Sequence, residues 1–153
     1  MPSQRVKIDK QHPAIYKALV AVSIEVKNAA AEAGLSRQVI ELVNMRCSQI
    51  NGCAFCLSLH HDDAVKAGVT EQQLAVLPAW REAPFIYDDQ MRAALDLTEA
   101  VTELPGHEDM QCAYERAADI LDADQLSTVI WAANAMNAFN RVSIMSVHNV
   151  RPR

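Results

Sequence analysis

Two cysteines and a histidine lie at helical spacing in the middle of the chain, and these residue types can carry out thiol redox chemistry. Cys53 and Cys56 are three positions apart, and His60 follows Cys56 by four. On a helix the two sulfurs share one face, so a disulfide between them is geometrically feasible. His60 lies one turn further along that face, where it can exchange a proton with Cys56 directly or through one water.

The position of the pair at a predicted helix start favours the thiolate form of its cysteines. Gly52 ends the preceding helical pattern, which places Cys53 in the first turn of the next helix. Free N–H groups and the positive end of the helix dipole lower thiol pKa values there. The dipole favours Cys53 as the more acidic thiol, whereas the nearby base His60 favours Cys56, and we assign the attacking role to Cys56.

Glu41 is a further ionisable candidate because it interrupts the apolar stretch Val39–Val43. If the helices on either side of Gly52 fold back on one another, Glu41 faces the cysteine pair. Burial in an apolar cleft would raise the pKa of this carboxyl and allow it to act as a base near neutrality. The alternative is a solvated or ion-paired residue on a helix surface.

Sparse glycines and prolines separate stretches of apolar residues with helical period, and no stretch alternates like a strand. Proline in the first turn and capping residues such as Ser36, Thr70 and Asp88 mark helix starts. The predicted helices cover residues 13–33, 36–51, 53–67, 70–77, 88 to about 101, 108–121 and 124–147, with a connecting segment at 78–87. The prediction is an all-α fold, a compact helical bundle of about six to seven helices.

Composition excludes several classes of function. The chain has 153 residues, of which 50% are hydrophobic, enough for one domain over residues 1–153 with a core of its own. The formal charge of −5 argues against nucleic acid as a partner. No apolar stretch resembles a signal peptide or is long and apolar enough to cross a bilayer, so we expect a cytoplasmic protein with no membrane partner.

Together these residues resemble the signature of the alkylhydroperoxidase D (AhpD-like) family, within the carboxymuconolactone decarboxylase-like superfamily. Glu41 is followed after eleven residues by Cys53, then after two by Cys56 and after three by His60. The stretches 46–53, 79–82 and 137–141 also look like parts of the family pattern. The resemblance is close over about residues 41–101 and looser toward both ends.

The resemblance implies an all-helical protein that assembles as a homo-oligomer, a trimer or hexamer, and reduces hydroperoxides. By this likeness Cys56 is the attacking thiolate, Cys53 the resolving thiol, and Glu41 and His60 the proton relay. An external dithiol donor protein would reduce the disulfide again, and no cofactor or metal is needed. Some members carry a second histidine between the cysteines, where this chain has Phe55, which puts a full-strength relay in doubt.

Other functions would use the same residues. The pair fits a protein disulfide oxidoreductase or a redox-sensing module, whereas a decarboxylase or lactone enzyme needs no redox thiols. A structural zinc site with His60 or His61 as a further ligand lacks a second cluster of ligands. Cys47 and Cys112 are expected to be buried. The recurrence of Asn134, Asn137 and Asn140 predicts a polar stripe at a subunit contact.

Overall fold

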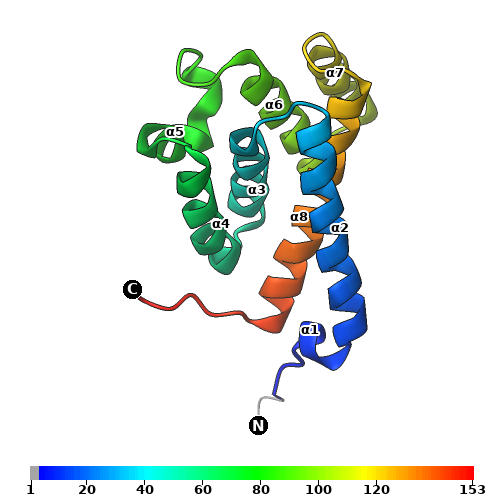
Figure 1. The fold of residues 1–153 in the computed structure, drawn as a ribbon, viewed down its shortest axis with the longest axis vertical. Coiled ribbons are helices and arrows are strands. Elements are labelled where there is room, and N and C mark those ends of the chain that lie inside the picture. Colours follow the sequence, from blue (N-terminus) through cyan, green and yellow to red (C-terminus); the bar gives the residue numbers. More distant parts are fainter. Residues whose placement is uncertain (1–3) are drawn as a thin grey trace.

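The computed structural model describes residues 4–153 and contains helices and no strand within them, which confirms the all-α prediction. Figure 1 shows how the helices follow one another around a central α3. Their bounds are α1 Ile8–Gln11, α2 Pro13–Glu32, α3 Arg37–Asn51, α4 Ala54–Ala67, α5 Glu71–Val76, a 3₁₀ helix Leu77–Glu82, α6 Asp89–Glu103, α7 His107–Ala118 and α8 Ala123–Ser146.

Most helix starts lie where the capping residues predicted them. The Ser36 and Asp88 side chains accept hydrogen bonds from backbone N–H groups three residues on, and Thr70 forms a capping box with Gln73. Two elements were not predicted. The four-residue α1 is too short to show a period, and the 3₁₀ helix occupies part of the predicted connecting segment because Leu77 and Trp80 are buried in the core.

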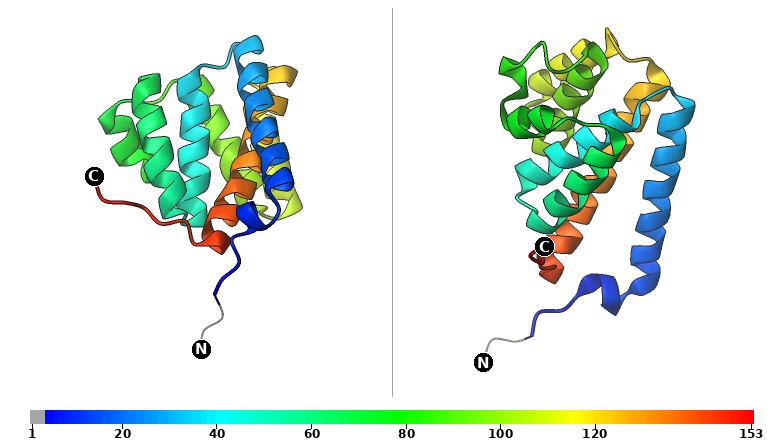
Figure 2. Two further views of the ribbon diagram at one scale, coloured as in Figure 1. Left: turned by 60° about the horizontal axis from the view of Figure 1, so that its bottom comes forward. Right: turned by 60° about the vertical axis from the view of Figure 1, so that its left-hand side comes forward.

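Helix α3 lies at the centre of the molecule, in contact with α2, α4, α6 and α8. The views in Figure 2 show it enclosed by these neighbours. Residues 39–45 are all buried, including Glu41 and Asn44. A helix that packs on every side needs an almost continuous apolar sequence, so the two polar residues must find partners inside the protein.

Polar side chains fasten α8 to the C-terminal end of α3. Asn51 donates through Nδ2 to Oδ1 of Asn137 at 2.7 Å and of Asn140 at 3.0 Å. Asn140 in turn donates to the Ser48 hydroxyl at 3.0 Å. The prediction that the asparagines face a subunit contact is therefore wrong for Asn140, which is fully buried within the chain, while Asn137 is half-buried and Asn134 is exposed.

A second polar cluster joins α3 to α6 and the 3₁₀ helix. The Glu99 carboxylate accepts hydrogen bonds from Arg46 Nε, Trp80 Nε1 and Arg81 Nη2, each at 2.8 Å. Burial alone raises the pKa of Glu99, but these hydrogen bonds and the Arg46 charge lower it below its usual value. The two clusters hold the C-terminal half of α3, and so fix the turn that follows it.

None of the helices in residues 4–153 combines the length and the hydrophobicity that crossing a membrane requires. The longest, α8, has 24 residues, and the asparagines described above interrupt its apolar sequence.

Candidate active site

The turn between α3 and α4 places the cysteine pair. Gly52 adopts the left-handed conformation, with φ 67° and ψ 35°, which glycine adopts without the steric penalty of a side chain. The Gly52 N–H donates to the Gln49 carbonyl at 3.2 Å and the Cys53 N–H to the Ser48 carbonyl at 3.0 Å. This is the Schellman arrangement that closes a helix, and it reverses the chain so that α4 folds back along α3.

Cys53 is the N-cap of α4, one position before the first turn in which the sequence predicted it. Its Sγ accepts a hydrogen bond from the Cys56 N–H at 3.4 Å. The two cysteines form a disulfide, with their Cα atoms 5.3 Å apart. Both are buried, with exposed fractions of 2% and 4%. The pair therefore lies among the free N–H groups at the positive end of the helix, as expected.

Glu41 and His60 lie together in the structure. The sequence predicted this for the case that the two helices fold back on one another, and they do. Glu41 is fully buried, and its Oε2 lies 3.0 Å from His60 Nδ1. Asn44, one turn further along α3, donates through Nδ2 to the same oxygen at 3.2 Å. Oε1 of Glu41 is buried without a hydrogen-bond partner in the described structure. This role of Asn44 was not predicted from the sequence. Its position three residues after Glu41, on the same helix face, was the signal that could have indicated the hydrogen bond.

The predicted rise in the pKa of Glu41 is wrong in direction. Burial raises the pKa of this carboxyl, but hydrogen bonds from His60 and Asn44 and the charges of His60 and Lys27 outweigh it. The pKa of Glu41 therefore lies below its usual value, because its partners stabilise the charged form. Glu41 is an ionised hydrogen-bond acceptor here and not a base poised near neutrality.

An ionised Glu41 decides which nitrogen of His60 carries the proton. A carboxylate can only accept, so His60 Nδ1 must be the N–H that donates to Oε2. In the neutral ring, Nε2 then holds the lone pair and is free to act as a base. Glu41 thus acts through His60, by fixing the orientation and the tautomer of its ring.

A pocket of about 240 Å³ opens between α2, α3, α4 and α8, and Cys56 and His60 both line it. Cys53 and Glu41 do not line this pocket. Its other walls are mostly apolar and include Phe55, Leu59 and Phe139. Leu59 is 49% exposed, so the pocket reaches the surface. A small molecule entering it would meet Cys56 and His60, and not Cys53.

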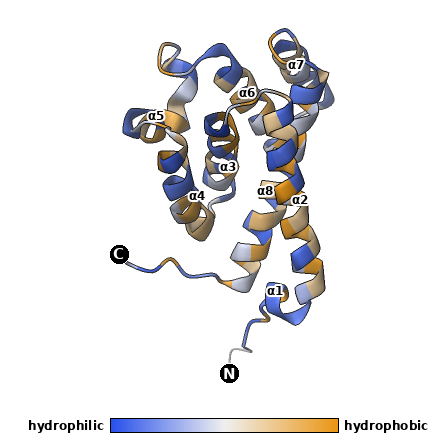
Figure 3. Cartoon of the chain, viewed as in Figure 1, coloured by the Kyte–Doolittle hydropathy of each residue, from blue (hydrophilic) through white to orange (hydrophobic). Residues whose placement is uncertain are grey.

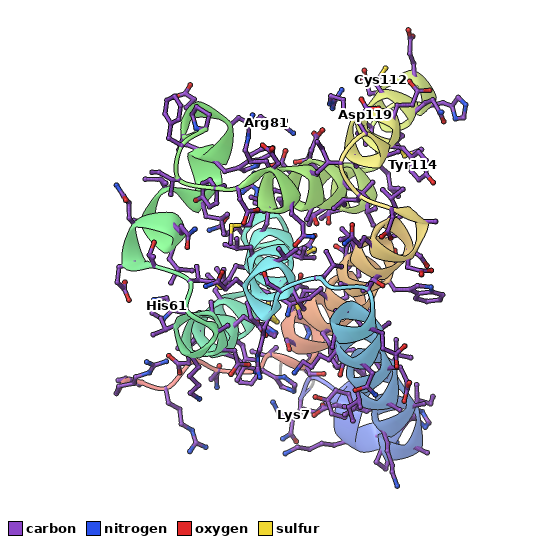
Figure 4. All side chains as sticks on the ribbon, turned by 45° about the horizontal axis from the view of Figure 1, so that its top comes forward. Lys7, His61, Arg81, Cys112, Tyr114 and Asp119 are labelled. Atoms are coloured by element: carbon purple, nitrogen blue, oxygen red, sulfur yellow. A yellow bond between two sulfur atoms is a disulfide. The ribbon has the colours of Figure 1, made fainter. Side chains whose placement is uncertain are left out.

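Phe55, at the position where some family members carry a second histidine, has a packing role. Phe55, between the cysteines, packs edge to face against His148, with ring centres 5.2 Å apart. His148 pairs through Nε2 with Asp9 at 3.2 Å, which ties α1 to the end of α8. His61 faces outward on α4 next to Asp62 (Figure 4).

The other two cysteines differ from one another. Cys47 is buried, which confirms the prediction, and burial raises the pKa of its thiol to about 11. Cys112 was also predicted to be buried, and this is wrong. It lies exposed on α7 (Figure 4), because that helix buries only Ala113 and Ala117.

Glu41, His60 and Asp63 are the described residues whose ligand atoms come close enough to share a metal ion, within 4.8 Å of one another. Asp63 Oδ2 lies 4.0 Å from His60 Nδ1. Such an ion would take the atoms that now form the Glu41–His60 hydrogen bond, so this set offers a metal site or a proton relay but not both at once. The predicted zinc alternative would use the cysteine pair, which lies outside this group.

The sequence of this chain matches that of a known protein family. The sequence profile of the Carboxymuconolactone decarboxylase family matches residues 13–100, which include the whole motif from Glu41 to His60. The chain belongs to this family. The resemblance to its AhpD-like members, stated from the motif, is confirmed by the structural comparison below.

Two relatives cover most of the chain. The uncharacterised protein YdfG of Bacillus subtilis is 35% identical over 123 residues, which are 80% of this chain and 83% of that protein. A protein of unknown function from Agrobacterium tumefaciens, suggested to be the antioxidant defence protein AhpD, has a similar crystal structure. Its TM-score is 0.86 at 28% identity, covering 99% of this chain and 100% of that one.

The lowered pKa of Glu41 predicts a pH-dependent contribution to stability. A carboxyl with a lower pKa in the folded state stabilises the protein above its unfolded pKa, and this stabilisation is lost as pH falls through the folded value. The unfolding free energy of the wild type, relative to that of Glu41→Gln, should therefore decrease as pH falls below 4.5. Urea denaturation of both proteins over the acid range measures it. A wild-type advantage that grows on acidification would mean that burial dominates.

Proposed function

We propose that the protein is a thiol peroxidase that reduces alkyl hydroperoxides through a Cys53–Cys56 dithiol–disulfide cycle. The observation that carries the proposal is that Cys56 and His60 line one pocket while the buried Glu41 holds His60 at 3.0 Å. The membership of an AhpD-like family is consistent with an antioxidant role. A disulfide at a helix start favours redox chemistry over lactone decarboxylation, which needs no redox thiols.

Access assigns the roles of the two cysteines. Cys56 lines the pocket and Cys53 does not, so a peroxide in the pocket meets Cys56 first. His60 Nε2 takes the Cys56 proton, and the helix start stabilises the resulting thiolate. Cys53, which is disulfide-bonded to Cys56, is the resolving thiol.

The cycle balances without a cofactor. The Cys56 thiolate attacks the outer oxygen of the hydroperoxide, the O–O bond breaks, and the alkoxide takes a proton from His60 to leave as an alcohol. Cys56 is now a sulfenic acid. The Cys53 thiol displaces its hydroxyl group as water and forms the disulfide. A dithiol donor protein supplies two electrons and two protons, returns both cysteines to thiols, and becomes oxidised itself.

The alternative function, oxidation or reduction of protein disulfides, uses the same pair. Both cysteines are at least 96% buried, and the opening to Cys56 is a pocket of small-molecule size. These features favour a small peroxide as the oxidant over a folded protein disulfide. The donor has to reach Cys56 through the same opening, so we expect it to present its thiol on a projecting segment.

We also propose that the chain forms a homo-oligomer, a trimer or hexamer, through α2 and α8. Hydrophobic residues recur along α2 (Figure 3), and Ile15 and Ile24 are 69% and 53% exposed. An apolar groove of about 440 Å³ lies between α2 and α8 beside Val22 and Trp131, and Trp131 is 58% exposed. Exposed apolar surface of this kind marks protein interfaces.

Serine variants of the two cysteines test the role assignment. Cys56→Ser should lose peroxide consumption, because no attacking sulfur lines the pocket. Cys53→Ser should still consume about one equivalent of cumene hydroperoxide and then stop with a sulfenic acid on Cys56, since the resolving thiol is missing. Peroxide titration and mass spectrometry of dimedone-treated protein measure both. A sulfenic acid trapped on Cys53 in Cys56→Ser would reverse the roles.

Replacing Glu41 tests the relay separately from the thiols. Glu41→Gln should slow the attack on cumene hydroperoxide by about a hundredfold, because the His60 ring loses the carboxylate that fixes its tautomer. Diamide should still form the Cys53–Cys56 disulfide. Asp63→Asn is the matched control, since Asp63 lies 4.0 Å from the same nitrogen and is more exposed, and it should have a much smaller effect. Unchanged stopped-flow rates in Glu41→Gln would remove Glu41 from the mechanism.

Sedimentation tests the assembly. The wild type should sediment at three or six times the chain mass of 16.9 kDa, and Trp131→Glu should lower this mass by placing a charge in the apolar groove. Tyr114→Glu changes an exposed aromatic residue on α7, outside the groove (Figure 4), and should leave the mass unchanged. A wild-type mass of one chain would contradict the proposal.

A further inference from the structure

The active-site pocket carries a lysine that the thiol cycle does not use. Lys27, on α2, lines the same pocket as Cys56 and His60. It also lines a second hollow of about 200 Å³, on whose wall Glu41 lies. In the part of the chain that the structure describes, Lys27 forms no ion pair. Lys27 is an exposed residue of the pocket lining, so its side chain offers the pocket a positive charge that no described carboxylate pairs with.

The Lys27 charge interacts with Glu41. It is one of the causes that lower the pKa of that carboxyl. The carboxylate that lines the pocket, Asp63, lies 4.0 Å from His60 and is not paired with Lys27. Glu41 already accepts hydrogen bonds from His60 and Asn44. An anionic group on a bound molecule would therefore pair with Lys27.

The rest of the pocket suits a hydrocarbon chain. Tyr16 and Val20, on the same helix as Lys27, face Met136 and Phe139 of α8 across the pocket, and the Tyr16 and Phe139 rings pack edge to face with centres 6.1 Å apart. Leu59 continues this apolar wall to the surface. Mostly apolar walls with one cation, Lys27, match a molecule that has a long apolar body and one acidic group.

We propose that Lys27 binds the carboxylate of an amphiphilic substrate, so that the preferred substrates are hydroperoxides of fatty acids. This rests on the proposed peroxidase function and narrows its substrate class. The cycle is unchanged: Cys56 takes the outer peroxide oxygen, the fatty acid leaves as its hydroxy acid, and the carboxylate keeps its charge at Lys27 throughout. Lys27 determines specificity and takes no part in breaking the O–O bond.

Matched substrates test the charge on the ligand. The kcat/KM for linoleic acid hydroperoxide is compared with that for its methyl ester, which has the same hydrocarbon chain without the charge, both below their micellar concentrations. The wild type should prefer the acid by about tenfold, the effect of one charged hydrogen bond. Lys27→Gln should remove this preference and Lys27→Arg should keep it. Lys17→Gln removes a charge from the same helix outside the pocket and should also keep it.

Equal acid-to-ester ratios in the wild type and Lys27→Gln would overturn the assignment of Lys27 while leaving the peroxidase intact. Loss of the preference in Lys17→Gln to the same extent would also overturn it, since the effect would then come from general charge.

A binding measurement separates this inference from the proposed function. Isothermal titration calorimetry of the oxidised protein should show decanoate binding about tenfold more tightly than 1-decanol, and Lys27→Gln should abolish the difference. This result without any hydroperoxide consumption would refute the peroxidase function while supporting an acid-binding pocket. Equal binding of decanoate and decanol to the wild type would refute the Lys27 site.

Discussion

Glu41 is a carboxylate without exposed surface in the most enclosed helix of the molecule, and its burial constrains everything around it. An unpaired buried charge costs several kcal/mol, so the fold has to supply partners. Asn44 supplies one from the same helix, and His60 supplies the other from α4. Packing α4 against α3 in another register would leave Glu41 without His60. The Glu41–His60 pair therefore also fixes how the two helices lie.

The turn that allows this packing also positions the cysteine pair. Gly52 closes α3 in a left-handed conformation, and the next residue, Cys53, is already the cap of α4. No linker separates the two helices, so the end of one and the start of the other share a single hydrogen-bonded turn. The polar clusters that hold the end of α3 against α6 and α8 thereby hold the cysteine pair as well.

Local signals predicted the architecture, and contacts between distant segments limited the prediction of the site. Ser36, Thr70 and Gly52 act on their immediate neighbours, and the helix ends they predicted agree with the structure. The proximity of Glu41 to His60 could be predicted because it requires only that α4 folds back on α3. The direction of the shift in the Glu41 pKa could not be predicted, because it depends on Lys27 of α2 and on the balance between burial and hydrogen bonding. Cys112 was misjudged because residue type alone does not show which face of α7 is buried.

The helix start cannot by itself distinguish the two sulfurs. Cys53 caps α4 and Cys56 is its third residue, so both lie within the first turn, over which the dipole acts. The difference between them comes from their surroundings, since Cys56 lines the pocket with His60 while Cys53 lies behind it. With Phe55 between them in place of a second histidine, His60 is the one imidazole on the pocket wall formed by the described residues. In the proposed mechanism, base strength at this site therefore depends on Glu41 holding that single ring. The buried Glu41–His60 hydrogen bond would then link the stability of the fold to the reactivity of the thiol.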